Sequence, residues 1–229
     1  MRSHYWQDDD EQAEIRMNRA ADVAFGLSGR TLPVDYAAAL AHTVVEALPW
    51  LPGVHGAGLR LALGPAEGNG WQRNEGDGAL IYLPRRARLV LRLPSEWLDE
   101  ARALVGRTLA VAGDRLHVGE SRVIALAASA ALYARDVVDD THDECIFLER
   151  VARSIDSMGA RGRKIMCGKS RRIAAPGGGV RTRSVMMADL APRDSIALMT
   201  QGIGSRRLMG CGLFVPYKRA TPPARGTDE

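Results

Sequence analysis

Two glycine pairs near the carboxyl end place the strongest constraint on what this chain can fold into. Gly202-Ile203-Gly204 and Gly210-Cys211-Gly212 bracket five residues that include Arg206 and Arg207. Glycine permits positive φ and close approach of the backbone to a ligand, and successive free N–H groups form a concavity that suits anions. A helix-like stretch precedes the segment and an apolar, strand-like run follows it. The pattern predicts a loop that holds a phosphate group and leads into a strand.

Two familiar nucleotide-binding loops do not fit this segment. It lacks the Gly-Lys-Ser/Thr ending of the ATPase phosphate loop. The dinucleotide fingerprint requires a third glycine where Arg207 stands, and a strand before the loop rather than after it. The alternative that stays open is a glycine-rich hairpin with surface charge.

Hydrophobic periodicity predicts the same order of elements twice along the chain. In the first half it predicts a strand at 21–28, a break at 29–33, a helix over 34–48, strands at 59–63, 79–83 and 87–93, a helix over 95–105 and short strands within 106–123. In the second half it predicts a strand at 128–138, a helix over 143–158, strands at 163–173 and 180–190, a helix over 192–199 and a strand at 213–217. Each half follows strand-helix-strand-strand-helix-strand, which is the ferredoxin-like order.

We therefore predict an α+β fold with two tandem ferredoxin-like (RRM-like) domains. Their expected bounds are 21–127 and 128–218, with a flexible N-terminal arm over 1–20 and a disordered, proline-rich tail over 219–229.

The distribution of charge indicates a polyanion as partner. The net charge is only +4, but between Arg161 and Arg219 thirteen Lys and Arg face only Asp189 and Asp194. Such asymmetry is typical of nucleic-acid-binding surfaces, and its alternative is a solvated basic face. Strand parity predicts one basic face and one leucine-rich core face on the strand at 87–93. The expected RNA-contacting side chains outside the glycine loop are Arg86, Arg88, Lys164, Lys169, Arg171, Arg172, Arg181 and Arg183.

Composition excludes several other classes of protein. No run of about 18 apolar residues is present, so no membrane span is predicted, and the acidic N-terminus lacks the apolar core of an export signal. Cys145, Cys167 and Cys211 are scattered without Cys-x-x-Cys spacing, which argues against a zinc site and a disulfide framework. We expect a cytoplasmic protein without metal, cofactor or membrane partner.

The same residues suggest how RNA could be held and cut. Aromatic residues make up 5% of the chain, so recognition of a structured RNA backbone by Arg and Lys is favoured over stacking of single-stranded bases. Cleavage without metal needs a general base, a general acid and cations near the phosphate, and histidine suits acid–base work because it titrates near neutral pH. His42 lies on the polar side of the first predicted helix and His55 in the turn after it, so both can reach one substrate. The alternative for each is a surface histidine.

The glycine motif and several further phrases resemble one protein family. GRTLPVDYAAAL, RRARLVLRLP, TRSVMMADL and GCGLFVPYK are similar to the CRISPR repeat-cleaving endoribonucleases of the Cas6 family, Myxan-type subgroup, within the RNA-binding RAMP superfamily. The resemblance runs from Ala21 to Lys218. It implies cleavage of precursor CRISPR RNA without metal, leaving a 2′,3′-cyclic phosphate, and an RNA-contacting loop at 202–212.

The resemblance also implies where the active site lies. In this family it is beside the first helix and the turn that follows, which implies His55 and His42 here, with Tyr36 as a further candidate. Arg60 would balance charge, and it stands where related chains carry a histidine.

Three functions remain open from the sequence. The first is an endoribonuclease that stays bound to its cleaved hairpin as a subunit of a type I CRISPR effector complex. The second is a catalytically inactive subunit that holds the crRNA hairpin. The third, a small-molecule-binding ferredoxin-like protein, is disfavoured by the charge asymmetry.

Overall fold

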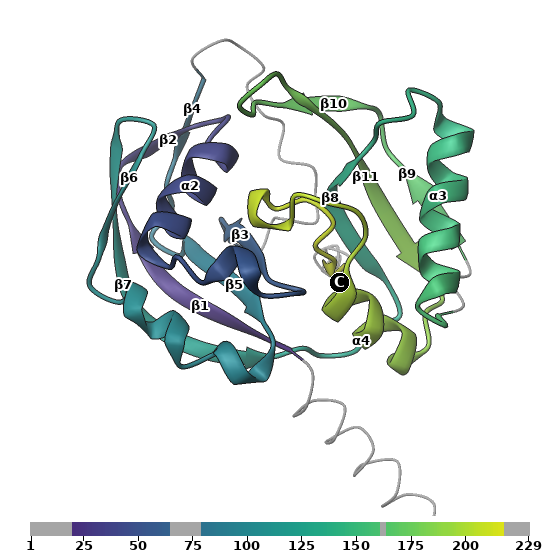
Figure 1. The fold of residues 1–229 in the computed structure, drawn as a ribbon, viewed down its shortest axis with the longest axis horizontal. Coiled ribbons are helices and arrows are strands. Elements are labelled where there is room, and N and C mark those ends of the chain that lie inside the picture. The colour runs from purple at the N-terminus through teal and green to yellow at the C-terminus, as the bar shows by residue number, and fades with distance from the viewer. Residues whose placement is uncertain (1–19, 65–78, 161–163, 218–229) are drawn as a thin grey trace, which may run out of the picture.

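The computed structural model describes residues 20–64, 79–160 and 164–217, which form two antiparallel β-sheets and a small third one (Figure 1). The sheet from the first half of the chain lies at the left of the view, the sheet from the second half lies at the right, and a loop near the carboxyl end lies between them. The predicted arm lies outside the described residues apart from Ala20, and the predicted tail lies wholly outside them.

The first sheet has the strand order β3-β5-β1-β7-β6, and every neighbouring pair is antiparallel. Its strands are β1 (Ala21–Ser28), β3 (Gly58–Ala62), β5 (Arg88–Leu93), β6 (Thr108–Val111) and β7 (Asp114–Ala125). Helix α2 (Ala37–Ala47) connects β1 to β3 through the short 3-10 helix η1 (Leu51–Gly53). The four strands β3-β5-β1-β7 have the order expected for a ferredoxin-like unit, with β6 added at the edge.

Two local features of this half differ from the sequence prediction. The expected helix over 95–105 is two 3-10 helices, η3 (Ser95–Trp97) and η4 (Glu100–Leu104), and neither has the side-chain cap that would fix a first α-helical turn. The expected break at 29–33 contains β2 (Thr31–Pro33), which pairs with β4 (Leu80–Tyr82) to form the small third sheet.

The first hydrophobic core lies between this sheet and α2. Alternate residues of β1 and β5 point to the same side, and the register sets Phe25 opposite Leu89 and Val23 opposite Leu91. These side chains pack with Leu40 of α2, which is 2% exposed. The helix therefore follows from the spacing of its apolar residues, as the sequence predicts.

The second sheet repeats the arrangement with the order β10-β11-β8-β12, and β9 also pairs with β11. Its elements are β8 (Leu132–Val138), α3 (Glu144–Ser157), β9 (Lys164–Cys167), β10 (Arg171–Ile173), β11 (Val180–Ala188), α4 (Pro192–Gln201) and β12 (Val215–Pro216). The single strand predicted at 163–173 is divided into β9 and β10. Helix α3 begins where expected, because the Asp143 carboxylate accepts a hydrogen bond from the Ile146 N–H at 3.0 Å.

On the predicted basic face of β5, Arg92 is covered by the second half of the chain. Arg92 is 3% exposed. Its Nε lies 2.7 Å from Asp22 Oδ1, and its Nη1 donates to the carbonyls of Met199 at 3.0 Å and Phe214 at 2.7 Å. Burial opposes ionisation of Asp22, but Arg92 and then Arg60 outweigh it, so the pKa of that carboxyl lies below its usual range. Arg92 thus joins the two halves.

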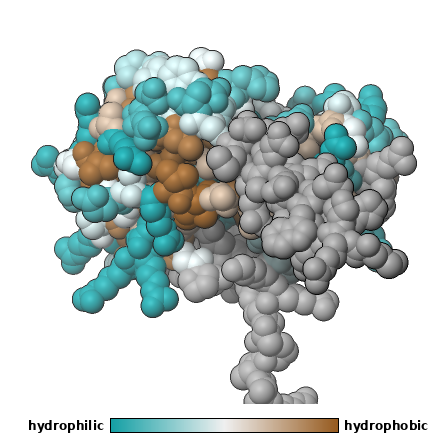
Figure 2. Space-filling view, turned by 90° about the horizontal axis from the view of Figure 1, so that it is seen from below, coloured by the Kyte–Doolittle hydropathy of each residue, from teal (hydrophilic) through white to brown (hydrophobic). Residues whose placement is uncertain are grey.

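The outer surface includes both polar and apolar areas. Figure 2 shows hydrophobic residues gathered on the lower side of the half that carries the first sheet, bordered by hydrophilic side chains. Among the described helices, none is long and apolar enough to cross a membrane.

Candidate functional site

The glycine loop (residues 202–212) follows α4 and lies against both halves of the chain. Gly202 and Gly212 have φ values of 65° and 67°, and the Ile203 N–H donates to the Gly212 carbonyl at 3.1 Å. A Cβ at Gly212 would overlap the carbonyl oxygen of Ile203, and one at Gly202 would overlap the Arg207 guanidinium. These two glycines are therefore required by the close approach of the backbone to its own loop.

The tip of the loop has the properties of an anion-binding concavity. Gly204 and Arg206 are left-handed, with φ values of 78° and 60°. Within the described chain, the N–H groups of Gly204, Ser205 and Arg206 donate to no acceptor. Among the residues that the structure describes, the exposed Arg206 guanidinium has only Met209 Sδ within hydrogen-bonding range, at 3.9 Å. The tip therefore presents backbone donors and one cation to solvent.

Arg207 has a different role from its neighbour, because its guanidinium is bound by the protein. It donates to the carbonyls of Gly56 at 2.7 Å and Ala57 at 3.2 Å in the first half, and to those of Thr200 at 3.2 Å and Gln201 at 2.5 Å in the second. Four of its five N–H groups are thereby used. Burial, with a smaller contribution from the Arg92 charge, lowers the pKa of Arg207 to about 10, so it stays protonated at neutral pH.

The candidate acid–base residues lie on or next to the elements that the sequence predicts. His55 is exposed in the turn between η1 and β3, directly before the Gly56 carbonyl that Arg207 binds. His42 is exposed on α2, where its Nε2 lies 3.4 Å from Glu46 Oε1. Tyr36 precedes α2, is half-buried and lines a cavity that neither histidine lines.

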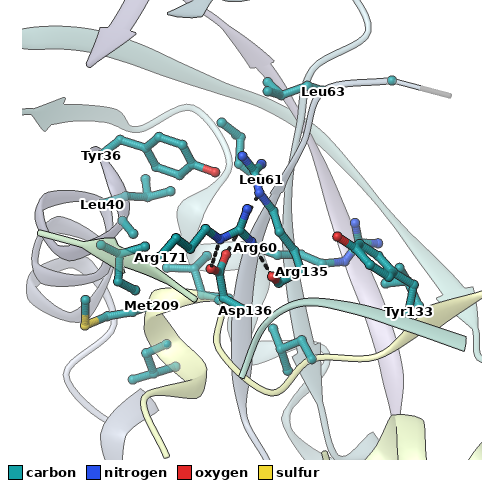
Figure 3. Close-up of a pocket in the computed structure, with 18 residues that line it drawn as sticks. Tyr36, Leu40, Arg60, Leu61, Leu63, Tyr133, Arg135, Asp136, Arg171 and Met209 are labelled. Carbon is teal, nitrogen blue, oxygen red and sulfur yellow. Dashed lines mark hydrogen bonds and ion pairs between the residues drawn. The ribbon is translucent and has the colours of Figure 1, made fainter. Parts of the chain in front are cut away.

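This cavity, of about 150 Å³, lies between the first and second halves (Figure 3). Its polar lining comes from Tyr36, Arg60, Tyr133, Arg135, Asp136 and Arg171, and residues 208–210 of the glycine loop complete it. Arg171 Nε donates to Asp136 Oδ1 at 2.8 Å, and its Nη2 donates to the Arg135 carbonyl. Sequence reasoning missed Tyr133 and Arg135, although alternation along the strand predicted at 128–138 places both on one face.

The other predicted RNA-contacting residues have varied surroundings. Lys164 and Arg172 are exposed, the first 2.9 Å from Asp189 Oδ2 and the second bound to the Gly179 carbonyl at 3.3 Å. Exposed or half-buried positions are also held by Lys169, Arg181, Arg86 and Arg88.

Arg183 differs from these, because it is buried within the second half. It lies 2.9 Å from Asp139 Oδ2 and 3.0 Å from Glu144 Oε2, and its guanidinium lies 5.9 Å from the centroid of the Phe147 ring. Burial disfavours ionisation of Asp139, but hydrogen bonds from Thr141 and Arg183 outweigh it, so the pKa of Asp139 lies below its usual range. Arg183 is therefore engaged in the fold, and its predicted contact with RNA would require breaking these bonds.

The described residues contain no group of three or more His, Cys, Asp or Glu side chains placed to hold a metal ion. The chemical groups around the glycine loop and the cavity include the phenols of Tyr36 and Tyr133, the Asp136 carboxylate and several guanidinium groups. The His55 imidazole lies in the turn that Arg207 binds.

Comparison with known proteins identifies relatives along nearly the whole described chain. The family model for Cas6 CRISPR proteins matches residues 21–219. The "CRISPR-associated endonuclease Cas6" of Myxococcus xanthus (strain DK1622) is 30% identical over 200 residues, which cover 87% of this chain and 82% of that protein.

Solved structures support the fold. The structure described as a Cas6-related gene product from Pyrococcus furiosus matches with a TM-score of 0.58 at 12% identity, covering 86% of this chain and 98% of that one. A structure described as CRISPR associated protein Cas6 matches with a TM-score of 0.59 at 10% identity, covering 87% and 100%. These similarities confirm the predicted tandem ferredoxin-like fold.

Proposed function

Because the chain belongs to the Cas6 family, we propose that it is a CRISPR RNA-processing endoribonuclease. It binds the repeat hairpin of the precursor RNA, cleaves it without a metal ion, leaves a 2′,3′-cyclic phosphate and stays bound as a subunit of a type I effector complex. The observation that carries the proposal is the family match over residues 21–219, which includes the glycine loop.

The loop tip supports the RNA-binding part of this proposal. Three free N–H groups and the Arg206 guanidinium point to an anion that lies across the tip, and the phosphate backbone of a hairpin supplies such anions. Arg207 supports the same function indirectly, because its bonds to the Gly56 and Thr200 carbonyls hold the loop against the first half. The two arginines therefore have separate tasks: Arg206 contacts RNA and Arg207 fixes the loop.

The proposed chemistry is an internal transfer at one phosphate. A neutral imidazole, that of His55 or His42, takes the proton from the 2′-hydroxyl, and the 2′-oxygen forms a bond to the adjacent phosphorus. The bond from phosphorus to the 5′-oxygen breaks, and a protonated group donates a proton to that oxygen. The second histidine or Tyr36 is the candidate donor, and Arg60 beside Tyr36 offsets the charge that develops on the phosphate.

The turn that carries His55 is well suited to position a catalytic group. Its carbonyls at Gly56 and Ala57 accept from Arg207, so the backbone next to His55 is tied to the loop that would hold the RNA. A fixed distance between a phosphate-binding loop and an acid–base group reduces the entropy lost on reaching the transition state.

One observation favours a second candidate function, a catalytically inactive subunit that holds the crRNA hairpin. Both histidines are exposed, and neither lines the cavity between the two halves. A chain that binds the hairpin through the loop needs neither histidine.

Cleavage of the host's own repeat RNA in EDTA tests the proposal. We expect wild type to cut, His55→Ala or His42→Ala to lower single-turnover cleavage at least 100-fold with affinity retained, and His117→Ala to behave as wild type. His117 is the matched control because it is an exposed histidine on β7.

The possible outcomes separate the two candidates. Tight binding without cleavage by wild type would favour the inactive hairpin-binding subunit. Cleavage that occurs only with added divalent metal would contradict the metal-free scheme. Absence of hairpin binding would overturn both functions. Mass spectrometry of the product identifies the 2′,3′-cyclic phosphate, and rapid multiple turnover would contradict retention of the hairpin.

A further inference from the structure

We propose that the cavity between the two halves binds one unpaired nucleotide of the RNA, next to the hairpin held by the glycine loop. The inference rests on the proposed RNA-binding function. It adds a second contact, which holds a single base outside the helix and is built from residues of both halves.

The walls of the cavity come from separate elements that the fold brings together. Tyr36 precedes α2, Arg60 lies on β3, and Tyr133 and Arg135 lie on β8. On β8 the alternate residues Leu132 and Ala134 are buried in the second core, so Tyr133 and Arg135 face the cavity. Figure 3 shows the two tyrosines at opposite sides, with arginine side chains between them.

The size of the cavity fits one base. A volume of about 150 Å³ leaves room for one planar ring system. Aromatic and apolar side chains such as Tyr133, Met209 and Leu213 line it, and bases stack on such surfaces irrespective of sequence.

The charge of the lining selects for an anion attached to that base. Arg60, Arg135 and Arg171 line the cavity with Asp136 as the only carboxylate among its lining residues. Asp136 already accepts from Arg171 at 2.8 Å and from Thr182 Oγ1 at 2.7 Å. The lining is therefore net positive as well as partly apolar. A nucleotide matches both properties, because its base can pack on the apolar side chains and its phosphate can pair with the arginines.

The position of the cavity indicates that this ligand is part of the RNA. Leu208, Met209 and Gly210 of the glycine loop form one side of it, directly after the exposed donors at 204–206. A strand whose phosphate lies on the loop tip can therefore place a neighbouring base in the cavity. A base of the stem is held by pairing and stacking, whereas an unpaired base can be splayed out of the strand, so the nucleotide comes from the single-stranded flank of the hairpin.

A mutant cycle between protein and RNA tests this inference. Hairpin RNA with unpaired flanks, blocked against cleavage by a 2′-deoxy substitution at the scissile position, is compared with RNAs that carry one abasic nucleotide at each flank position in turn. Affinities are measured by fluorescence anisotropy for wild type, Tyr133→Leu, Arg135→Gln and the control Tyr82→Leu. Tyr82 is 75% exposed on β4 and does not line the cavity.

We expect one flank position at which removal of the base weakens wild-type binding about tenfold, the contribution of one stacked base. Tyr133→Leu should cause a similar loss on intact RNA and no further loss on the RNA that is abasic at that position. Arg135→Gln should weaken binding of both RNAs and lower the salt dependence by about one charge. Tyr82→Leu should change nothing.

Two results would overturn the inference while the proposed function stands. One is equal wild-type affinity for hairpins with and without flanks, and the other is additive effects of Tyr133→Leu and base removal at every position. Failure of wild type to bind any of these RNAs would instead overturn the proposed function, and this inference with it.

Discussion

The two adjacent arginines of the glycine loop give the sharpest test of the structure. Arg207→Met removes four hydrogen bonds from a charged donor to the carbonyls of Gly56, Ala57, Thr200 and Gln201. At roughly 1 kcal/mol net for each bond, the sum is about 4 kcal/mol. Water can reach part of this site and hydrate the freed carbonyls, so we expect a loss of about 3 kcal/mol in the free energy of unfolding.

Arg206→Met is the matched control. Arg206 is exposed and its guanidinium has only Met209 Sδ within hydrogen-bonding range in the described chain, so its replacement should change stability by less than about 0.5 kcal/mol. Both variants keep a long, non-glycine side chain, so the left-handed backbone at Arg206 carries the same strain before and after substitution.

Urea unfolding measures the difference. The stacked Trp50 and Trp97 rings, with centroids 4.8 Å apart, report on the first half through fluorescence, and far-UV circular dichroism reports on both halves. At a slope of about 3 kcal/mol per molar urea, Arg207→Met should lower the midpoint by about 1 M and Arg206→Met should leave it unchanged. The reverse should hold for hairpin affinity, where Arg206→Met lowers the salt slope by about one. Equal midpoints for the two variants would refute the assignment of Arg207 to the fold.

Three further predictions follow from burial and backbone geometry. Gly212→Ala should lower the free energy of unfolding by about 3 kcal/mol or more, because the new Cβ would overlap the Ile203 carbonyl. Gly204→Ala has open space around it and should cost only about 1 kcal/mol, the strain of a left-handed backbone. Similar losses of thermal stability in the two variants would contradict the close approach at Gly212. The folded-state pKa of Asp139 is lowered, so its stabilisation is fully present above the unfolded pKa near 4 and is lost as pH falls through the folded-state pKa. Asp139→Asn should therefore destabilise at pH 7 and flatten the decline in urea midpoint as pH falls below about 4, and an unchanged profile would oppose this. Burial, and to a smaller extent Asp136, raises the pKa of the Cys211 thiol to about 12. A thiol reagent at pH 8 should therefore label the exposed Cys145 at once and the buried Cys211 only on unfolding. Equally fast labelling of both cysteines would show that the glycine loop opens.

The arrangement of elements was largely predictable because it depends on local periodicity. The strand at 21–28 coincides with β1, and the helix expected over 143–158 contains α3 (Glu144–Ser157) with its acidic cap. These elements carry their own signals in apolar spacing, capping and flanking glycine. The helix at 95–105 was wrong because a pattern of apolar residues does not separate an α-helix from two 3-10 turns.

The tasks of individual arginines were not predictable, because they depend on residues far away in the sequence. Parity alone shows that Arg92 points away from its own core, but not that the other half of the chain covers it. Arg206 and Arg207 are adjacent residues of the same type, yet only Arg207 donates hydrogen bonds to carbonyls about 150 residues earlier in the chain. Arg183 was predicted to contact RNA because of its charge, whereas in the structure it is buried and paired with the carboxylates of Asp139 and Glu144.

The bonds of Arg92 have a consequence for synthesis of the chain on the ribosome. Its carbonyl partners at Met199 and Phe214 lie 107 and 122 residues further along the chain. At roughly 5–20 residues per second, the ribosome needs on the order of 5 to 25 s to supply them. For the later part of that interval the first sheet can be outside the exit tunnel with this guanidinium bound by Asp22 but not by the second half, and the face that the second half will cover is open to solvent. The nascent first half is therefore a sheet with one face exposed that is covered in the folded protein. The speed of translation over the last hundred residues determines how long other chains can bind to that face.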